Sequence, residues 1–283
     1  MEWYEKEGFD NNPFEPDPLK HSYGLVGQDK GREELVYRIL SGGMVVIEGK
    51  PGSGKTHLLK HAIDNFRGEG KVIYVDGKKL SKHLNIEKLL KGRVFKKIPK
   101  DMILLLDNVQ NLTRTNSEKI KYYYDQDNIK SVIFTTDDYA KVNFTDSIRD
   151  RVGKHVLKLK DLSKASAVEM VKARLNGKDT LNDDYIEKVI ALSEKNPADI
   201  LANSAQLYEH LVKNGKEVKD IKKVIHGSGH EEPKGEERCD VCSGKLAKVK
   251  DAWRCPTCDT YCTACGALVD EKDDSCPGCG ASF

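Results

Sequence analysis

The feature that most constrains this 283-residue chain is a glycine-rich loop of pattern G-x-x-x-x-G-K-T, which runs from Gly49 to Thr56. The apolar run 44–47 precedes the loop, and a helical pattern at 57–63 follows it. Between a strand and a helix, such glycines let backbone N–H groups surround a phosphate without a Cβ clash, and the helix N-terminus adds further N–H groups. The sequence therefore predicts a nucleoside triphosphate site, rather than a glycine-rich turn without a ligand.

Two side chains of this loop carry the expected chemistry. Lys55 is expected to reach the β- and γ-phosphates, and the Thr56 hydroxyl is expected to bind Mg²⁺. The apolar run 102–106 ends in Asp107, as in a Walker B strand that brings an aspartate to the metal. The alternative is an aspartate that only ends a strand. The expected nucleotide contacts are Gly49, Lys50, Pro51, Gly52, Ser53, Gly54, Lys55, Thr56, His57 and Asp107.

Apolar runs predict an α/β fold with a P-loop NTPase parallel sheet. Continuous apolar strands separated by helical stretches are expected where both faces of the sheet are covered. From Ser163 onward helical spacing replaces the strands, with Asn182 and Asn196 as caps, which predicts a small helical lid domain. The expected strands are 44–47, 72–76, 102–107 and 131–135, and the expected helices are 28–40, 163–175, 183–193 and 198–212.

All eight cysteines lie in the last 45 residues, as four C-x-x-C pairs. Two such pairs can form a tetrahedral S₄ site that suits Zn²⁺, whereas a thioredoxin-like redox motif would need a βαβ context that is missing here. Only three residues separate Cys258 from Cys262, so these pairs are expected to bind different ions. The pattern resembles a double zinc ribbon, and the absence of histidine after position 238 disfavours a cross-braced RING. The expected ligands are Cys239, Cys242, Cys255 and Cys258 for one ion, and Cys262, Cys265, Cys276 and Cys279 for the other.

Composition shifts divide the chain further. The stretch 9–18 is too rich in proline for a helix or a central strand, and 227–237 reads as a linker. We find no apolar run of transmembrane length and no signal peptide, so a cytoplasmic protein with reduced thiols is expected. The expected domains are 1–30, an extended N-terminal segment; 31–160, the nucleotide-binding domain; 161–226, the helical lid; 227–238, the linker; and 239–283, the zinc ribbons.

The order and spacing of these motifs resemble AAA+ ATPases over about residues 9–215. The likeness is greatest to the branch of secretion-associated and transposition-helper ATPases, with origin-recognition ATPases nearby. It rests on the phosphate loop and on the stretches 107–112 (D-N-V-Q-N-L), 135–137 (T-T-D) and 147–151 (S-I-R-D-R).

The resemblance implies further roles. Thr135 or Thr136 would be the sensor 1 group near the γ-phosphate, and Val26 would lie beside the adenine. Arg151, or else Arg149, would be an arginine finger that reaches the γ-phosphate of a neighbouring subunit in a homo-oligomer. The alternative for Arg151 is an ordinary surface arginine.

Two positions depart from the family pattern. Asn108 stands where relatives usually carry the glutamate that polarises the attacking water, and an amide cannot act as a carboxylate base. Ala198 stands where many relatives place a sensor 2 arginine, and it cannot contact phosphate. Whether the chain is an ATPase therefore stays open, with ATP and Mg²⁺ binding expected ahead of rapid turnover.

The charge distribution leaves two kinds of partner open. Residues 71–100 include ten Lys and Arg residues and two acidic residues, which gives a local net charge of +8. This basic segment could bind along a DNA backbone or form a solvated helical face. The region 239–283 carries a net charge of −2, which favours docking to a protein. Trp253, Leu268 and Phe283 are candidate contacts, and the alternative is that each packs in the small core of this region. The basic residues are Lys71, Lys78, Lys79, Lys82, Lys88, Lys91, Arg93, Lys96, Lys97 and Lys100.

The sequence leaves three possible functions open. The first is a slow ATPase whose nucleotide state controls self-assembly or partner engagement, with zinc ribbons that dock a protein. The second is an ATP-dependent DNA-binding loader or a helper in transposition or replication. The third is a nucleotide-bound scaffold that does not hydrolyse ATP. Salt-dependent DNA binding would separate the second from the others, and steady-state turnover would separate the third.

Overall fold

The computed structural model describes residues 2–21, 23–64, 66, 70–77, 86–91, 98–215, 217–218, 220–225, 247–249, 252–254, 267–268, 275–276, 279 and 282. The chain divides into two compact units. Unit 1 comprises residues 1–33, 50–65 and 159–232, and unit 2 comprises residues 34–49, 66–158 and 233–283.

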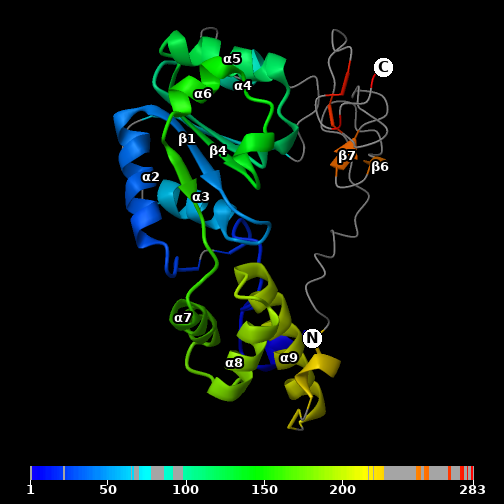
Figure 1. Cartoon of the computed structure of the whole chain (residues 1–283). Helices are drawn as coiled ribbons and strands as arrows, with labels where there is room; N and C mark the ends of the chain where they lie inside the picture. The colour runs from blue at the N-terminus through cyan, green and yellow to red at the C-terminus, as the bar shows by residue number, and fades with distance from the viewer. Residues whose placement is uncertain are drawn as a thin grey trace. The chain divides into compact units, whose positions relative to one another are not determined.

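Unit 2 is built on a five-stranded sheet in the order β2-β3-β4-β1-β5, in which all pairs are parallel (Figure 1). Its strands are β1 (Gly43–Glu48), β2 (Val72–Asp76), β3 (Met102–Asp107), β4 (Ile129–Thr136) and β5 (Val156–Lys158). Every residue of β3 is buried, as expected for a parallel strand covered on both faces. The predicted parallel sheet is confirmed. The edge strand β5 was not predicted because it has only three residues, two of them half-buried and one exposed, which give no apolar pattern.

Helices cover both faces of this sheet. On one face, apolar residues of three helices pack against alternate residues of the strands, including Leu104 and Phe134. On the other face, Ser131 of β4 donates a hydrogen bond to the carbonyl of Ile39, over 2.9 Å. Ile39 belongs to α2 (Asp29–Ser41), close to the predicted helix. The three helices on the first face are α4 (Ile86–Lys91), α5 (Arg114–Asp125) and α6 (Asp146–Val152), and two short 3₁₀ helices are η2 (Val109–Asn111) and η3 (Tyr139–Lys141).

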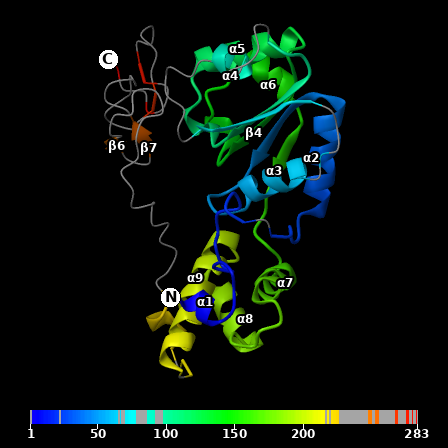
Figure 2. The same cartoon turned by 180° about the vertical axis from the view of Figure 1, so that it is seen from behind.

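Unit 1 is helical (Figure 2), and the helices that begin at Trp3, Lys164, Asp183, Pro197 and Ile221 share one apolar core. Residues such as Val171, Ile186 and Leu207 form this core, and they lie on helices that were predicted from the sequence. Asn182 and Asn196 cap their helices through their side chains, as predicted. The helices are α1 (Trp3–Lys6), α3 (Lys55–Asp64), α7 (Lys164–Leu175), α8 (Asp183–Leu192) and α9 (Pro197–Asn214), followed by the 3₁₀ helix η4 (Ile221–Lys223).

The N-terminal segment belongs to this helical core. It begins with α1, a short helix where an extended chain was expected, and Trp3 lies with its ring centroid 5.1 Å from that of Tyr208. Phe14 is fully buried in the same cluster. The sequence gives no sign of this packing because Tyr208, in α9, is about two hundred residues away.

The described parts of the C-terminal region are short. An antiparallel hairpin of β6 (Ala247–Val249) and β7 (Ala252–Arg254) precedes an isolated antiparallel bridge between Ser275 and Ser282. Leu268 is buried, so it is not an exposed docking contact. Over the described part of the chain, no helix is both long and apolar enough to cross a membrane.

Candidate functional site

The phosphate loop adopts a backbone that only its glycines accept easily. Gly52 and Gly54 have φ angles of +77° and +92°, in the region that disfavours residues with a Cβ. The N–H of Ser53 closes a turn by donating to the Lys50 carbonyl over 3.1 Å. Helix α3 starts at Lys55, directly after the turn. The loop therefore ends at a helix N-terminus, as a phosphate site requires.

Polar groups in this loop fit a triphosphate. Lys55 is only 6% exposed, and its Nζ donates to the carbonyl of Lys50 over 3.0 Å, so the ammonium is folded back over the loop. The buried hydroxyl of Ser53 has no hydrogen-bond partner within the described residues. Apart from Gly54 itself and its two neighbours in the chain, no described atom lies within 4 Å of the position that a Cβ on Gly54 would take. A buried cation, an unsatisfied hydroxyl and open space beside a glycine are together suited to an anionic ligand.

The start of α9 contacts the phosphate loop within unit 1. Asn196 donates from Nδ2 to the carbonyl of Pro51 over 2.8 Å, and the N–H of Ala198 donates to the carbonyl of Gly52 over 3.2 Å. A Cβ added to Gly52 would overlap Oδ1 of Asn196 and lie 2.9 Å from Cβ of Ala198. The lid helix thus touches the loop backbone at the position where the resemblance would place a sensor 2 arginine.

His57 and the N-terminal segment lie on the same unit. Nε2 of His57 is 3.0 Å from the carbonyl oxygen of Tyr23, and burial lowers the pKa of this histidine. The Arg174 guanidinium stacks 3.6 Å from the centroid of the Tyr23 ring and donates to the carbonyls of Pro13 and Glu15. Burial lowers the pKa of Arg174 to about 10. Arg174 therefore fixes the segment that leads towards Val26.

Val26, the predicted adenine contact, is half-buried on this segment. The neighbouring Gly27 has a φ of +73°, and a Cβ there would lie 2.9 Å from Oγ of Ser166 in α7. The role of Val26 stays a prediction. Sequence reasoning missed Arg174, because one arginine in an amphipathic helix carries no distinguishing signal.

In unit 2, Asp107 sits at the carboxyl end of β3 and is almost fully buried. Its Oδ2 accepts a hydrogen bond from the Tyr74 hydroxyl over 2.9 Å, and its Oδ1 accepts one from the Thr135 hydroxyl. A carboxylate oxygen is the kind of ligand that Mg²⁺ prefers. Asp107 therefore fits the predicted magnesium ligand.

Asn108, the next residue, is held by both neighbouring strands. Its backbone is left-handed, with φ of 59° and ψ of 57°, and its N–H donates to the Thr135 hydroxyl over 2.9 Å. Its side-chain Nδ2 donates to Oδ1 of Asp76, which ends β2, over 3.3 Å. In the strand register Asp76 is opposite Asp107. The structure thus gathers Asp107, Asn108 and Thr135, and adds Tyr74 and Asp76, which sequence reasoning missed as site residues.

The remaining predicted site residues of unit 2 make other contacts. Thr136 is buried, and its hydroxyl donates to the carbonyl of Asp138 over 3.4 Å. Arg151 binds Asp125 with N–O distances of 2.7 and 3.1 Å. Arg149 donates to the carbonyl of Val142 over 2.8 Å. None of these contacts involves Asp107, and the sensor and arginine-finger roles stay predictions.

Most of the predicted zinc ligands lie outside the described residues, namely Cys239, Cys242, Cys255, Cys258, Cys262 and Cys265. Of the other two, Cys276 is buried and Cys279 is exposed. Both lie in the sequence between Ser275 and Ser282, which form an antiparallel bridge. The described residues contain no group of three or more potential metal ligands.

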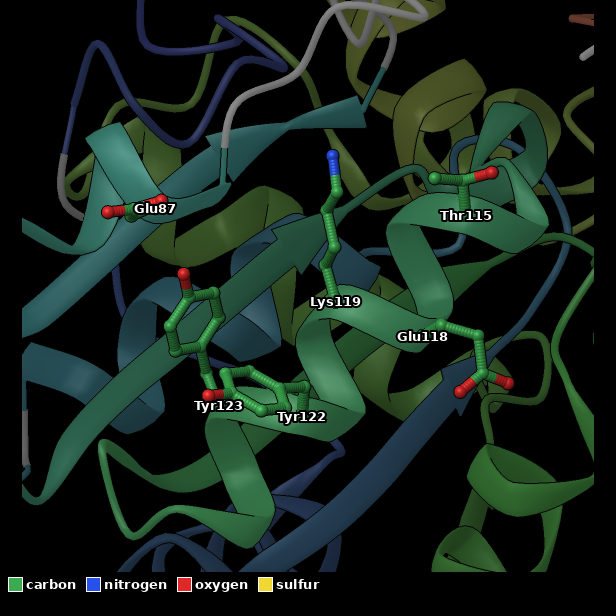
Figure 3. Close-up of a pocket in the computed structure, with 6 residues that line it drawn as sticks. All are labelled: Glu87, Thr115, Glu118, Lys119, Tyr122 and Tyr123. Carbon is green, nitrogen blue, oxygen red and sulfur yellow. The ribbon is translucent and has the colours of Figure 1, made fainter.

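Much of the basic strip between 71 and 100 also lies outside the described residues, including Lys78, Lys79, Lys82, Arg93, Lys96 and Lys97. Beside its described part, a cavity of about 520 Å³ opens between α4 and α5 (Figure 3). Two carboxylates and one lysine line this cavity, so its charge does not favour phosphate. The lining residues are Glu87, Thr115, Glu118, Lys119, Tyr122 and Tyr123, and none of them belongs to the candidate nucleotide site.

Comparisons with known proteins identify the fold. Residues 41–163 match the family model described as AAA domain. The structure resembles Cdc6p from Pyrobaculum aerophilum with a TM-score of 0.59 and 16% identity, over 78% of this chain and 73% of that one. A search of curated protein sequences returned no significant match.

Two further structures are similar. The Orc1 protein of Aeropyrum pernix, solved in complex with DNA, gives a TM-score of 0.56 and 15% identity over 72% of this chain and 64% of that one. Domain III of the replication initiation protein DnaA from Thermotoga maritima gives 0.53 and 20% over 76% and 95%. At these identities the likeness establishes the fold alone. With the AAA domain match, it confirms that the chain has the fold of an AAA+ ATPase.

Proposed function

We propose that this chain binds ATP with Mg²⁺, hydrolyses it slowly, and uses its nucleotide state to control self-assembly or the engagement of a partner. The observation that carries the proposal is the phosphate loop, where a nearly buried Lys55 and the unsatisfied Ser53 hydroxyl border the open side of Gly54. The loop residues 49–56 hold the triphosphate, and Thr56 and Asp107 hold the magnesium ion. Bound magnesium would neutralise charge on the β- and γ-phosphates.

Slow turnover is proposed because Asn108 replaces a carboxylate and Ala198 replaces a phosphate-binding arginine. Thr135 or Thr136 senses the γ-phosphate, and Arg151, or else Arg149, completes the site of a neighbouring copy. A guanidinium of this kind acts in the transition state, where it stabilises charge on the transferred group. The internal pairing of Arg151 with Asp125 would then have to open when copies associate.

Nucleotide control of the lid is supported by the contacts between α9 and the loop. Asn196 and Ala198 donate hydrogen bonds to the carbonyls of Pro51 and Gly52. A phosphate that changes the loop backbone would therefore change the position of α9 directly. A ligand shifts such an equilibrium only by its differential affinity for the two arrangements. The loop contacts supply that difference without a sensor 2 arginine.

We also propose that the eight cysteines bind two zinc ions, in the sets Cys239 to Cys258 and Cys262 to Cys279. In the sequence, the β6–β7 hairpin lies between the two cysteine pairs of the first set, as a ribbon requires. The last cysteine pair lies between the bridged residues Ser275 and Ser282. Zinc supplies folding free energy to such small modules. The acidic ribbons then dock a protein partner.

A second candidate function is an ATP-dependent DNA-binding loader or replication helper, with DNA bound along 71–100. The observation that favours it is the similarity to Orc1 solved in complex with DNA and to the DnaA replication initiation protein. Binding of this kind weakens steeply with salt because counterions are released from the phosphates.

One experiment separates the candidates. The protein is titrated with ATP and magnesium, its mass and turnover are measured, and fluorescent duplex DNA is added at 50 and 200 mM salt. ATP-dependent assembly with slow turnover and no DNA binding supports the first candidate. Salt-sensitive DNA binding supports the second, and tight ATP binding without turnover would instead indicate a nucleotide-bound scaffold.

A further inference from the structure

The carboxyl ends of β2 and β3 place a second carboxylate beside the Walker B residues. Asp76 and Asp107 are opposite each other in the register of these neighbouring strands, which lie about 4.8 Å apart in parallel sheets. The Asn108 side chain crosses to Asp76, with 3.3 Å between Nδ2 and Oδ1. A carboxylate is therefore present at the site even though position 108 carries an amide.

The backbone fixes this contact. Gly77 follows Asp76, and a Cβ on Gly77 would overlap the Asn108 carbonyl oxygen and lie 2.8 Å from its carbonyl carbon. Asn108 is itself held in the left-handed region by its bond to the Thr135 hydroxyl. The end of β2 therefore lies close against residues 107–108, which limits where the Asp76 side chain can go.

Of the neighbouring polar groups, Asp107 is the expected magnesium ligand, and Thr135 and Asn108 carry no carboxylate. Asp107 accepts hydrogen bonds on both oxygens, from Tyr74 and Thr135. The Thr135 hydroxyl donates its one proton to Asp107 and accepts from the N–H of Asn108. Asn108 has an amide, which does not accept a proton from water near neutral pH. Asp76 is half-buried and carries the chemistry that Asn108 lacks.

We propose that Asp76 is the carboxylate that activates the attacking water, and that Asn108 positions it; this inference rests on the proposed ATPase function. The water oxygen forms a bond to the γ-phosphorus while the bond from that phosphorus to the bridging oxygen breaks, and its electron pair stays on ADP. Asp76 takes the water proton and later releases it to solvent.

The test uses the full chain with Asp76→Asn, which keeps the shape and removes the carboxylate. We expect kcat to fall about a hundredfold, as for the loss of a general base, while the affinity for ATP changes less than about twofold. Affinity for ADP with aluminium fluoride, which mimics the transferring phosphoryl group, should fall at least about tenfold. The matched control is Asp137→Asn, directly after β4, where the carboxylate accepts a hydrogen bond from Gln110 over 2.7 Å and turnover should be unchanged.

The exchanged double variant Asp76→Asn/Asn108→Asp supplies a second readout. Restoring a carboxylate on the other strand should recover at least about tenfold of the lost turnover, which a purely structural role of Asp76 would not produce. Wild-type turnover by Asp76→Asn, or no recovery in the double variant, would overturn the proposal. If the wild type binds ATP without any turnover, the role of Asp76 is refuted, but the proposal of a nucleotide site is not. Failure of the wild type to bind ATP would instead refute the proposed function itself.

Discussion

Substituting Gly52 with alanine tests the contact between the phosphate loop and the lid helix. The φ of +77° alone costs a residue with a Cβ about 1–2 kcal/mol. The new Cβ would also overlap Asn196 and press on Ala198, so that α9 must move and lose two hydrogen bonds of about 0.5–1.5 kcal/mol each. We therefore expect a loss of about 2–5 kcal/mol of unfolding free energy.

The matched control is Gly215→Ala at the C-terminus of α9. Gly215 also has a positive φ, of +56°, but no described atom lies within 4 Å of its added Cβ, so only the backbone term of about 1–2 kcal/mol applies. Denaturation can be followed by the fluorescence of Trp3 in a Trp253→Phe background, because Trp3 lies in the core of unit 1. Gly52→Ala should unfold roughly 3–10 °C below the control. Equal thermal unfolding midpoints for the two variants would refute the contact between the phosphate loop and α9.

Three further predictions concern Asn108, the zinc ligands and Arg174. Asn108→Glu should leave turnover unchanged or lower it, because the new carboxylate meets Asp76; a rise of about a hundredfold in steady-state ATPase assays would show instead that Asp76 does not already supply the base. Metal analysis after gel filtration should find about two zinc ions per chain, and chelation should leave the melting of the ATPase fold unchanged; one ion or none would contradict the double ribbon. Arg174→Met keeps a long side chain but removes the donors to Pro13 and Glu15, so it should lower the unfolding free energy by about 1–3 kcal/mol; a loss below about 0.5 kcal/mol in urea titration would be inconsistent with this bridge.

The sequence predicts the parts of the fold that depend on local pattern. Strands such as β3 were predicted because a parallel strand buried on both faces must be continuously apolar. Asn182 was predicted as a cap because its short side chain satisfies N–H groups of the next turn. The short edge strand β5 and the helix α1 were missed, because three or four residues do not establish a period.

The site was predictable only where one segment carries it. The phosphate loop could be identified because its glycines, lysine and threonine are contiguous. The bond between Asn108 and Asp76 joins residues 32 positions apart, and the contact of Asn196 with Pro51 spans 145 positions. Such pairs depend on strand order and helix docking, which a single sequence does not specify.

The central claim is that the phosphate loop of residues 49–56 is an ATP site, and isothermal titration with ATP and magnesium tests it directly. The wild type should bind one ATP per chain, and Lys55→Ala should bind at least about a hundredfold more weakly, because the phosphates lose a nearly buried cation. Lys60→Ala, which removes a lysine paired with Asp64 further along α3, should bind as the wild type does. Equal affinities of the wild type and Lys55→Ala would contradict the claim.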